Sequence, residues 1–362
     1  MSRAASDPSV DPSALVPSAP AAPLPPFGQG RHLLSVSQFD RAGLQALFDV
    51  ADTVQPIAQR HGVCTVLDGA MLGSLFFEPS TRTRLSFESA FLRLGGEVTT
   101  TTGFTFSSMA KGESIADTAR VVSGYSDVLV VRHPDVGSVA QFAAASVVPV
   151  INGGDGAGEH PSQALLDCYT LEQELAARGK PMDGCRLAIL GDLKYGRTVH
   201  SLIRLMSLYD DIAFTLFAPA GLELPDEVAV VALARGHRVT VVPTVVDAVR
   251  GTDAVYATRV QRERLTDEGS ASSLAGDLLN RSLLEDAGNL DAILMHPLPR
   301  DSRPGSYDLS ADVDDLPGLA IFHQTDNGLA IRMAIFLTVL GVSAEAVHLT
   351  TKQRPWRADL RP

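Results

Sequence analysis

The stretch MLGSLFFEPSTRTR, residues 71–84, indicates both the fold class and the kind of ligand. Residues 71–77 form an apolar run typical of a buried parallel strand. A helical pattern of apolar residues follows over 85–94, and Gly95-Gly96 ends it. A strand, a short polar turn and a helix in this order are typical of α/β proteins, in which helices cover parallel sheets.

The turn between this strand and this helix has the composition of an anion site. It holds three hydroxyls and two guanidiniums in the run Ser80-Thr81-Arg82-Thr83-Arg84. The first amides and the dipole of a helix attract anions, and Ser, Thr and Arg side chains add charge-assisted donors. An ordinary N-cap with solvated arginines is the alternative interpretation. The density of donors favours a phosphate-binding turn.

Composition places the chain among soluble globular proteins. Its 362 residues suffice for two domains, and 45% of them are hydrophobic and 20% charged. The net charge of −12 argues against nucleic-acid binding, because no basic surface would offset the phosphate charge. Local arginines must therefore bind any anionic ligand. No apolar run reaches the length of a transmembrane helix, so we expect no membrane partner.

The cysteines and the N-terminal segment indicate the cellular compartment in which we expect the protein. Cys64, Cys168 and Cys185 have neither metal-ligand spacing nor the even number of a disulfide framework. We interpret them as reduced thiols of a cytoplasmic protein, and we expect neither a metal nor another cofactor. Residues 1–30 are rich in Pro, Ala and Ser and lack the pattern of a secretory signal. We expect them to form a disordered extension.

Strands and helices alternate from His32 onward and divide into two α/β units. The expected strands are 71–77, 97–102, 127–131, 147–151, 186–190, 212–217, 239–242, 254–257, 292–295 and 319–322. We expect two doubly wound domains, each with a mainly parallel sheet flanked by helices. Their expected bounds are 31–165 and 166–325. A C-terminal helix at 326–345, with its helical pattern from Gly328 to Leu340, should pack back on the first domain, and 346–362 should form a tail.

Polar motifs follow the predicted strands at their carboxyl ends. The residues that begin these motifs are Ser80, Arg132, Asn152, Asp192, Arg259 and His296. Open α/β sheets bind their ligands at that edge. Polar residues scattered over a surface would not follow strand ends so regularly, so we expect a single cleft.

Two of these motifs carry residues suited to a carboxylate. In GDLKYGRT, residues 191–198, Arg197 stands at the start of a helix. Arg259 and Gln261 lie on the same side of an extended segment. Arginine is suited to bidentate contact with carboxylates, although each arginine alone would more often form a solvent-facing salt bridge.

His160 and Gln163, three residues apart at a helix start, should face the same ligand. A lone histidine is more often structural, and the N-terminus of a helix favours its neutral form. The Gly-rich run 153–158 lacks the Lys-Ser or Lys-Thr of a P-loop. With no nucleophile motif and no metal set, the residues indicate direct transfer between two bound substrates, aided by positioning and by donors around a developing oxyanion.

Seven strings together resemble one enzyme family. They are FFEPSTRTR (76–84), KGES (111–114), RHP (132–134), GEHPSQALLD (158–167), GDLKYGRTVHS (191–201), TRVQRERL (258–265) and MHPLPR (295–300). They run in the family's order over 31–341, and the joint match is similar to the catalytic chains of the aspartate transcarbamoylase family. The resemblance implies transfer of the carbamoyl group of carbamoyl phosphate to the amine of L-aspartate, giving N-carbamoyl-L-aspartate and phosphate, in de novo pyrimidine biosynthesis.

The resemblance also implies roles for individual residues. It assigns to carbamoyl phosphate Ser80, Thr81, Arg82, Thr83, Arg132, His160, Gln163, Leu298 and Pro299. It assigns to aspartate Lys111, Arg197, Arg259 and Gln261. It assigns to the reaction itself Thr83, Lys111, Arg132 and His160. The first domain would bind carbamoyl phosphate and the second aspartate.

The family further implies a homotrimer with shared active sites, because Ser107 and Lys111 lie on a loop that in this family reaches into the neighbouring subunit. A regulatory chain or a dihydroorotase partner is possible. The sequence leaves open nucleotide regulation, the kinetic order, and the roles of 1–30 and 346–362.

Two other functions compete with this interpretation. Ornithine transcarbamoylases share the phosphate-binding turn, but would carry a Ser-Met-Gly loop and a His-Cys-Leu-Pro string where this chain has His296-Pro297-Leu298-Pro299. A non-catalytic scaffold for dihydroorotase should have lost residues of the phosphate-binding turn or the arginines, and none is lost here.

Overall fold

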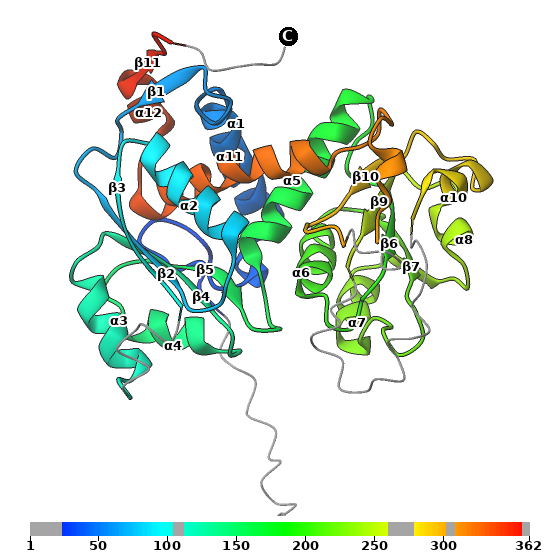
Figure 1. The fold of residues 1–362 in the computed structure, drawn as a ribbon, viewed down its shortest axis with the longest axis horizontal. Coiled ribbons are helices and arrows are strands. Elements are labelled where there is room, and N and C mark those ends of the chain that lie inside the picture. The colour runs from blue at the N-terminus through cyan, green and yellow to red at the C-terminus, as the bar shows by residue number, and fades with distance from the viewer. Residues whose placement is uncertain (1–23, 104–111, 260–278, 302–307, 357–362) are drawn as a thin grey trace, which may run out of the picture.

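The computed structural model describes residues 24–103, 112–259, 279–301 and 308–356. Two lobes stand side by side, each built on a parallel sheet, with the helices α5 (Pro161–Ala177) and α11 (Ile321–Leu340) between them (Figure 1). This arrangement confirms the expected class of two doubly wound α/β domains.

The sheet of the first lobe has four strands in the order β3-β2-β4-β5, all parallel. They are β2 (Met71–Phe76), β3 (Glu97–Thr102), β4 (Val128–His133) and β5 (Val150–Asp155). Helices α1 (Arg41–Ala58) and α2 (Thr81–Arg93) belong to this lobe, as do α3 (Ile115–Ser123) and α4 (Ser138–Ala145). Leu72 and Phe76 of β2 pack in the same cluster as α1 and α2, whereas Leu75 packs with α3 and α4. Helices therefore cover both faces.

The sheet of the second lobe has five parallel strands in the order β10-β9-β6-β7-β8. They are β6 (Arg186–Leu190), β7 (Ala213–Phe217), β8 (Arg238–Val241), β9 (Ala254–Ala257) and β10 (Ile293–Met295). Its helices are α6 (Arg197–Met206), α7 (Asp226–Ala234), α8 (Val245–Val249) and α10 (Arg281–Asp286). Val199 of α6 packs with Ile189 on one face, and Val249 of α8 packs with Leu190 on the other.

The cores of the two lobes are continuous through α5 and α11. One hydrophobic cluster contains residues of both sheets, such as Ile151 of β5 and Ile189 of β6, together with Leu165 of α5 and Ile331 of α11. Helix α11 contacts α1 and α2 of the first lobe as well as α5, so the C-terminal helix packs back on the first domain as expected. The expected domain border at residue 165 falls within α5, which continues to Ala177.

The predicted start of the last helix is wrong. Helix α11 begins at Ile321 and not at 326 or at Gly328, and the strand expected over 319–322 is reduced to a single bridge between Leu319 and Leu294. No side chain caps the helix, because Ala320 occupies the N-cap position. Gly328 lies inside the helix, where a Cβ atom would collide with the Arg332 guanidinium.

Both ends of the chain are more ordered than expected. In the tail expected over 346–362, α12 (Ala344–Thr350) continues into β11 (Thr351–Gln353), which pairs antiparallel with β1 (Gly62–Cys64). In the expected disordered extension, residues 24–30 are placed: the Phe27 ring lies 5.0 Å from that of Phe39. Apolar contact with the core explains both differences. Residues 1–23 and 357–362 lie outside the described part of the chain.

The structure also shows the state of the cysteines and whether the described residues could bind a metal ion or cross a membrane. The three cysteines are buried free thiols. Within the described residues, no group of three or more His, Cys, Asp or Glu side chains could hold a metal ion. Among the same residues no single helix is long and apolar enough to cross a membrane, and only α11 and α12 together, bent by 113°, meet that test. Two single-turn 3₁₀ helices, Val36–Gln38 and Ala311–Val313, complete the fold.

Candidate active site

A cavity of about 1110 Å³ lies between the two lobes, and the predicted site residues that the structure describes all line it. These are Ser80, Thr81, Arg82, Thr83, Arg132, His160, Gln163, Arg197, Arg259, Leu298 and Pro299. The other two predicted residues, Lys111 and Gln261, lie outside the described residues. Of the six residues that begin the polar motifs, Ser80, Arg132, Arg259 and His296 line this cavity, whereas Asn152 and Asp192 do not.

The strand order explains why these residues meet. In the first sheet the chain reverses its winding between the neighbouring strands β2 and β4, and in the second between β6 and β9. Open α/β sheets leave a crevice outside the carboxyl ends of the strands at such a switch point. Ser80 and Arg132 lie at the first switch point, and Arg197 and Arg259 lie at the second.

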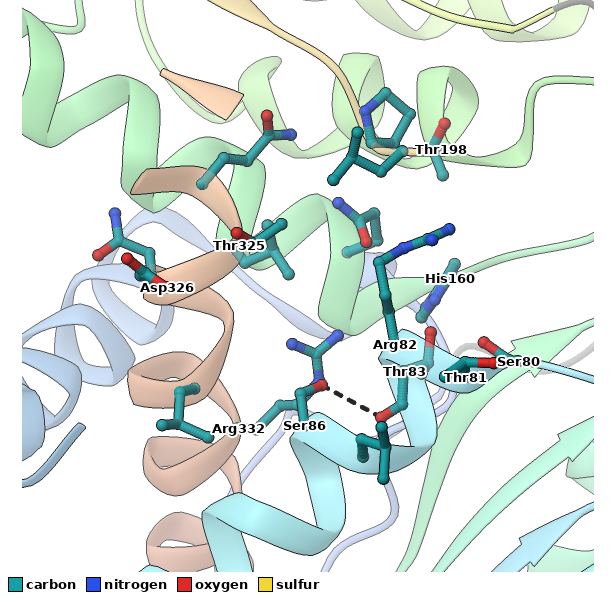
Figure 2. Close-up of a pocket in the computed structure, with 18 of the residues that line it drawn as sticks. Ser80, Thr81, Arg82, Thr83, Ser86, His160, Thr198, Thr325, Asp326 and Arg332 are labelled. Atoms are coloured by element: carbon teal, nitrogen blue, oxygen red, sulfur yellow. Dashed lines mark hydrogen bonds between the residues drawn. The ribbon is translucent and has the colours of Figure 1, made fainter. Parts of the chain in front are cut away.

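The phosphate-type turn is open to a ligand. Ser80 occupies the N-cap position of α2, yet its hydroxyl caps no amide of the helix, which argues against the ordinary N-cap interpretation. Thr83 is buried in the cavity wall. Figure 2 shows Arg82 extending from the start of α2 beside His160, with Thr198 of the second lobe opposite. Burial lowers the pKa of Arg82 because it disfavours the charged form, and a bound anion would stabilise that form again.

A carboxylate links arginines of the two lobes. Glu78, two residues after the end of β2, lies 2.8 Å from Arg132 and 3.5 Å from Arg197, measured from its Oε2 to their Nη2 atoms. Both guanidiniums are buried, at 8% exposure each. An anionic substrate that enters the cavity therefore competes with Glu78 for positively charged groups.

The Gly-rich run makes room for Arg132. Gly153 and Gly154 belong to β5, which extends further than the expected strand 147–151. The Gly153 carbonyl accepts a hydrogen bond from Nη1 of Arg132 at 3.1 Å. A Cβ atom on Gly154, whose φ is +131°, would lie 2.8 Å from the same nitrogen. The close approach of backbone and guanidinium explains the glycine there.

His160 is held as a neutral imidazole. It occupies the N-cap of α5, is 4% exposed, and its Nδ1 has no hydrogen-bond partner among the described residues. Burial, and then the positive charges of Arg197, Arg132 and Arg332, hold its pKa well below the ordinary value. A neutral imidazole can donate one hydrogen bond and accept another.

This environment predicts how His160 responds to pH. Because the fold disfavours the imidazolium, the unfolded chain takes up a proton below about pH 6.5 that the folded chain resists, so His160 lowers stability only as the pH falls. Histidine-selective ¹⁵N NMR, assigned with a His160→Gln variant, should show the neutral pattern from pH 8 down to about pH 5.5. A midpoint near the ordinary value would contradict this prediction.

A stiff loop from the second lobe completes the cavity wall. The Leu298–Pro299 peptide of this loop is cis. Its geometry depends on buried His296, whose Nδ1 accepts the Leu298 N–H at 2.8 Å and whose Nε2 lies 3.0 Å from Asp308. With Nδ1 accepting, Nε2 is the donor to the carboxylate.

Sequence reasoning missed two charged residues of the site. Glu78 lies inside the quoted motif but was given no role. Arg332 of α11 is 4% exposed, and within the described residues it has no carboxylate at ion-pair distance. Its Cζ lies 4.9 Å from the centre of the Phe87 ring, and burial lowers its pKa to about 10. A charged residue in an otherwise apolar helical pattern was the available signal.

Comparison with known families identifies the fold. The model of the "Aspartate/ornithine carbamoyltransferase, carbamoyl-P binding domain" matches residues 31–173, and that of the "Asp/Orn binding domain" matches 183–339. The chain belongs to the aspartate/ornithine carbamoyltransferase family. The first model ends within α5, and the second begins three residues before β6.

This chain is similar to members of the carbamoyltransferase family over most of the length of both sequences. The chain is 51% identical over 334 residues to the aspartate carbamoyltransferase catalytic subunit of Dichelobacter nodosus, covering 91% of this chain and 95% of the relative. It is 52% identical over 315 residues to that of Saccharophagus degradans, covering 87% and 94%.

Solved structures agree with this assignment. Aspartate transcarbamoylase from Trypanosoma cruzi, in complex with carbamoyl phosphate and aspartate, superposes with a TM-score of 0.77 at 37% identity over 88% of this chain and 99% of that one. The catalytic subunit from M. Jannaschii superposes with a TM-score of 0.75 at 38% identity, over 84% and 96%.

Proposed function

We propose that this chain transfers the carbamoyl group of carbamoyl phosphate to the amine of L-aspartate, giving N-carbamoyl-L-aspartate and phosphate in de novo pyrimidine biosynthesis. One observation carries the proposal: a single cavity joins a phosphate-type helix start of the first lobe to Arg197 and Arg259 of the second. The named relatives and the ligand complexes of similar structures support the same activity.

The residues divide into two substrate sites. Ser80, Thr81, Arg82 and Thr83 bind the phosphate, where the amides of α2 and the Arg82 guanidinium meet its charge. Arg197 and Arg259, with Gln261, hold the two carboxylates of aspartate. The Leu298 and Pro299 carbonyls contact the ligands.

The chemistry needs no covalent intermediate. The aspartate amine attacks the carbamoyl carbon, and the bond from that carbon to the phosphate oxygen breaks. Arg132, Thr83 and neutral His160 donate hydrogen bonds to the carbonyl oxygen as negative charge develops on it. The phosphate group takes the amine proton as the C–O bond breaks and leaves as the hydrogen phosphate dianion, so no side chain is assigned as a base. Holding both substrates in one cavity contributes much of the rate.

The direct test is an assay of the purified protein. With carbamoyl phosphate and L-aspartate it should form N-carbamoyl-L-aspartate and phosphate without added metal or nucleotide. L-Ornithine serves as the competing acceptor, because two arginines facing the acceptor suit a dicarboxylate and repel a second ammonium. Carbamoylation of ornithine but not aspartate would overturn the assignment.

Two substitutions should separate the two substrate sites. Arg82→Ala should weaken binding of carbamoyl phosphate, and Arg259→Ala should mainly raise the KM for aspartate. A charge-assisted hydrogen bond contributes roughly 1.5–3 kcal/mol, or about 10- to 150-fold. Steady-state kinetics with each substrate varied in turn measures both effects. Equal effects of each change on both substrates would contradict the division.

The assembly is part of the proposal. We infer a homotrimer whose active sites are shared, with Lys111 supplied by a neighbouring subunit, as the family resemblance implies. The chain would act in the cytoplasm, which is consistent with three buried thiols. Native mass measurement of the purified chain, alone and with co-purifying proteins, tests whether a regulatory chain or a dihydroorotase joins the trimer.

A further inference from the structure

A buried carboxylate stands directly behind one wall of the cavity. Asp167 lies on α5, one turn after Gln163, and is fully buried. Its Oδ1 accepts hydrogen bonds from Nε2 of Gln163 at 2.8 Å and from Nε2 of Gln324 at 2.6 Å. Its Oδ2 accepts one from the Tyr256 hydroxyl at 2.7 Å. Three elements, α5, α11 and β9, therefore meet at one carboxylate.

These contacts determine how the Gln163 side chain is oriented. An ionised carboxylate only accepts hydrogen bonds, so the NH₂ end of the Gln163 amide must face Asp167. Its carbonyl oxygen is then directed away from Asp167. Gln163 is half-buried and lines the cavity, and within the described residues no group donates to that oxygen. The cavity therefore presents a hydrogen-bond acceptor at this point of its wall.

A second side-chain amide at Asp167, that of Gln324, is oriented in the same way, with its NH₂ end toward the carboxylate. The Gln324 carbonyl oxygen accepts the backbone N–H of His296 at 3.0 Å, and a backbone N–H can only donate. The NH₂ end of Gln324 must then face Asp167, as it does. Both amide orientations thus follow from their partners. His296 also holds the Leu298 amide, so the same carboxylate is linked to the loop across the cavity.

We propose that Asp167 is a positioning residue that gives the site its selectivity for a carbamoyl over an acyl phosphate, by holding the Gln163 carbonyl oxygen toward the transferred group. A carbamoyl group carries an NH₂ that can donate to this oxygen. An acetyl group of nearly the same shape carries a methyl, which leaves the oxygen unpaired, and an unpaired buried acceptor costs affinity. The inference rests on the proposed function.

The burial of Asp167 supports a role beyond packing. Burial raises the pKa of Asp167 to about 6, against the three hydrogen bonds that lower it, and the carboxyl is mainly ionised at neutral pH. A buried ionised carboxylate is costly unless hydrogen-bond donors compensate for the lost hydration. No guanidinium or ammonium lies within ion-pair distance of Asp167 in the described part of the chain. Its compensation comes from three hydrogen-bond donors, two of them the amides that it orients.

The test compares three ligands on variants of the full chain. Isothermal titration gives the affinities of carbamoyl phosphate, acetyl phosphate and inorganic phosphate, which share the phosphate group and differ in the group attached to it. Asp167→Ala removes both acceptor oxygens and should weaken the binding of carbamoyl phosphate about fivefold. The affinities for acetyl phosphate and for inorganic phosphate should change by less than about twofold. Asp167→Asn, whose amide oxygen still accepts, should keep most of the selectivity.

Two controls separate positioning from a general loss of structure. Tyr256→Phe removes a hydrogen bond to the same carboxylate without touching Gln163, and should leave the ratio of carbamoyl to acetyl phosphate affinity unchanged. In a Gln163→Met background, Asp167→Ala should have no further effect on that ratio, because no amide remains to be oriented. If Asp167→Ala does not fold, Asp167→Val, which fills more of the space, replaces it.

The outcomes are distinct. Equal weakening of all three ligands, an unchanged ratio in Asp167→Ala, or additive effects in the double variant would each overturn the inference. If the unsubstituted chain binds carbamoyl phosphate selectively but does not carbamoylate aspartate, the proposed function fails while the role of Asp167 stands.

Discussion

An Arg132→Ala enzyme should turn over about 10²–10³-fold more slowly than the unsubstituted enzyme, the cost typical of losing one oxyanion donor. Arg132 is suited to this role because it is 8% exposed and is held by Glu78 and by the Gly153 carbonyl. A guanidinium that is already held beside the reacting group needs little rearrangement as the oxyanion forms. Initial rates at saturating substrates measure the effect on kcat.

Two further variants make this result specific. Arg132→Lys keeps the charge but not the fork of donors, so it should recover only part of the lost rate. Arg238→Ala removes an exposed arginine that pairs with Asp211 at 2.9 Å, away from the cavity, and should leave kcat unchanged. A loss confined to the KM for carbamoyl phosphate, with kcat intact, would place Arg132 in binding and not in stabilisation of the transition state.

Mixed trimers of two inactive variants should regain activity. If Lys111 from one subunit completes a site containing Arg82 of its neighbour, Lys111→Ala and Arg82→Ala homotrimers should each be nearly inactive. After dissociation and random reassembly of equal amounts, about a quarter of the sites would combine an intact Lys111 with an intact Arg82. Assay of the reassembled protein measures the recovery.

Subunit exchange must be verified in the same samples. Native mass spectrometry of differently labelled chains shows whether mixed trimers have formed. A mixture of two Arg82→Ala preparations, treated identically, controls for activation by reassembly itself. Mixed trimers without activity would show that each site is built from one chain.

Much of the fold could be predicted because buried parallel strands leave a clear sequence pattern. The expected strands 97–102, 186–190 and 254–257 coincide with β3, β6 and β9. The start of helix α11 was harder to predict from the sequence. The helix is buried on most sides and so lacks a polar face, and its N-cap residue, Ala320, has no capping side chain. Its apolar first residues resemble a strand, and Gly328 resembles a helix boundary although it makes room for Arg332.

Some predicted site residues, such as Ser80, Arg132 and Arg259, could be found because they lie at or after strand ends, and the roles of others, such as Lys111 and Gln163, were assigned by the family resemblance. Asp167 and Gln324 could not be found in this way. They are 157 positions apart, and only the packing of α5 against α11 brings them within 2.6 Å. The role of Glu78 likewise depends on two arginines from different lobes. Local patterns identify residues that face a ligand, whereas the residues that orient them depend on tertiary contacts.

The chain crosses between the two lobes twice, along α5 and back at the start of α11. A body joined to another at two points can rotate only about the line through those points. Any rotation of one lobe against the other would then be described by a single angle about that line. One well-chosen pair of spectroscopic labels, one on each lobe, would then report the whole motion.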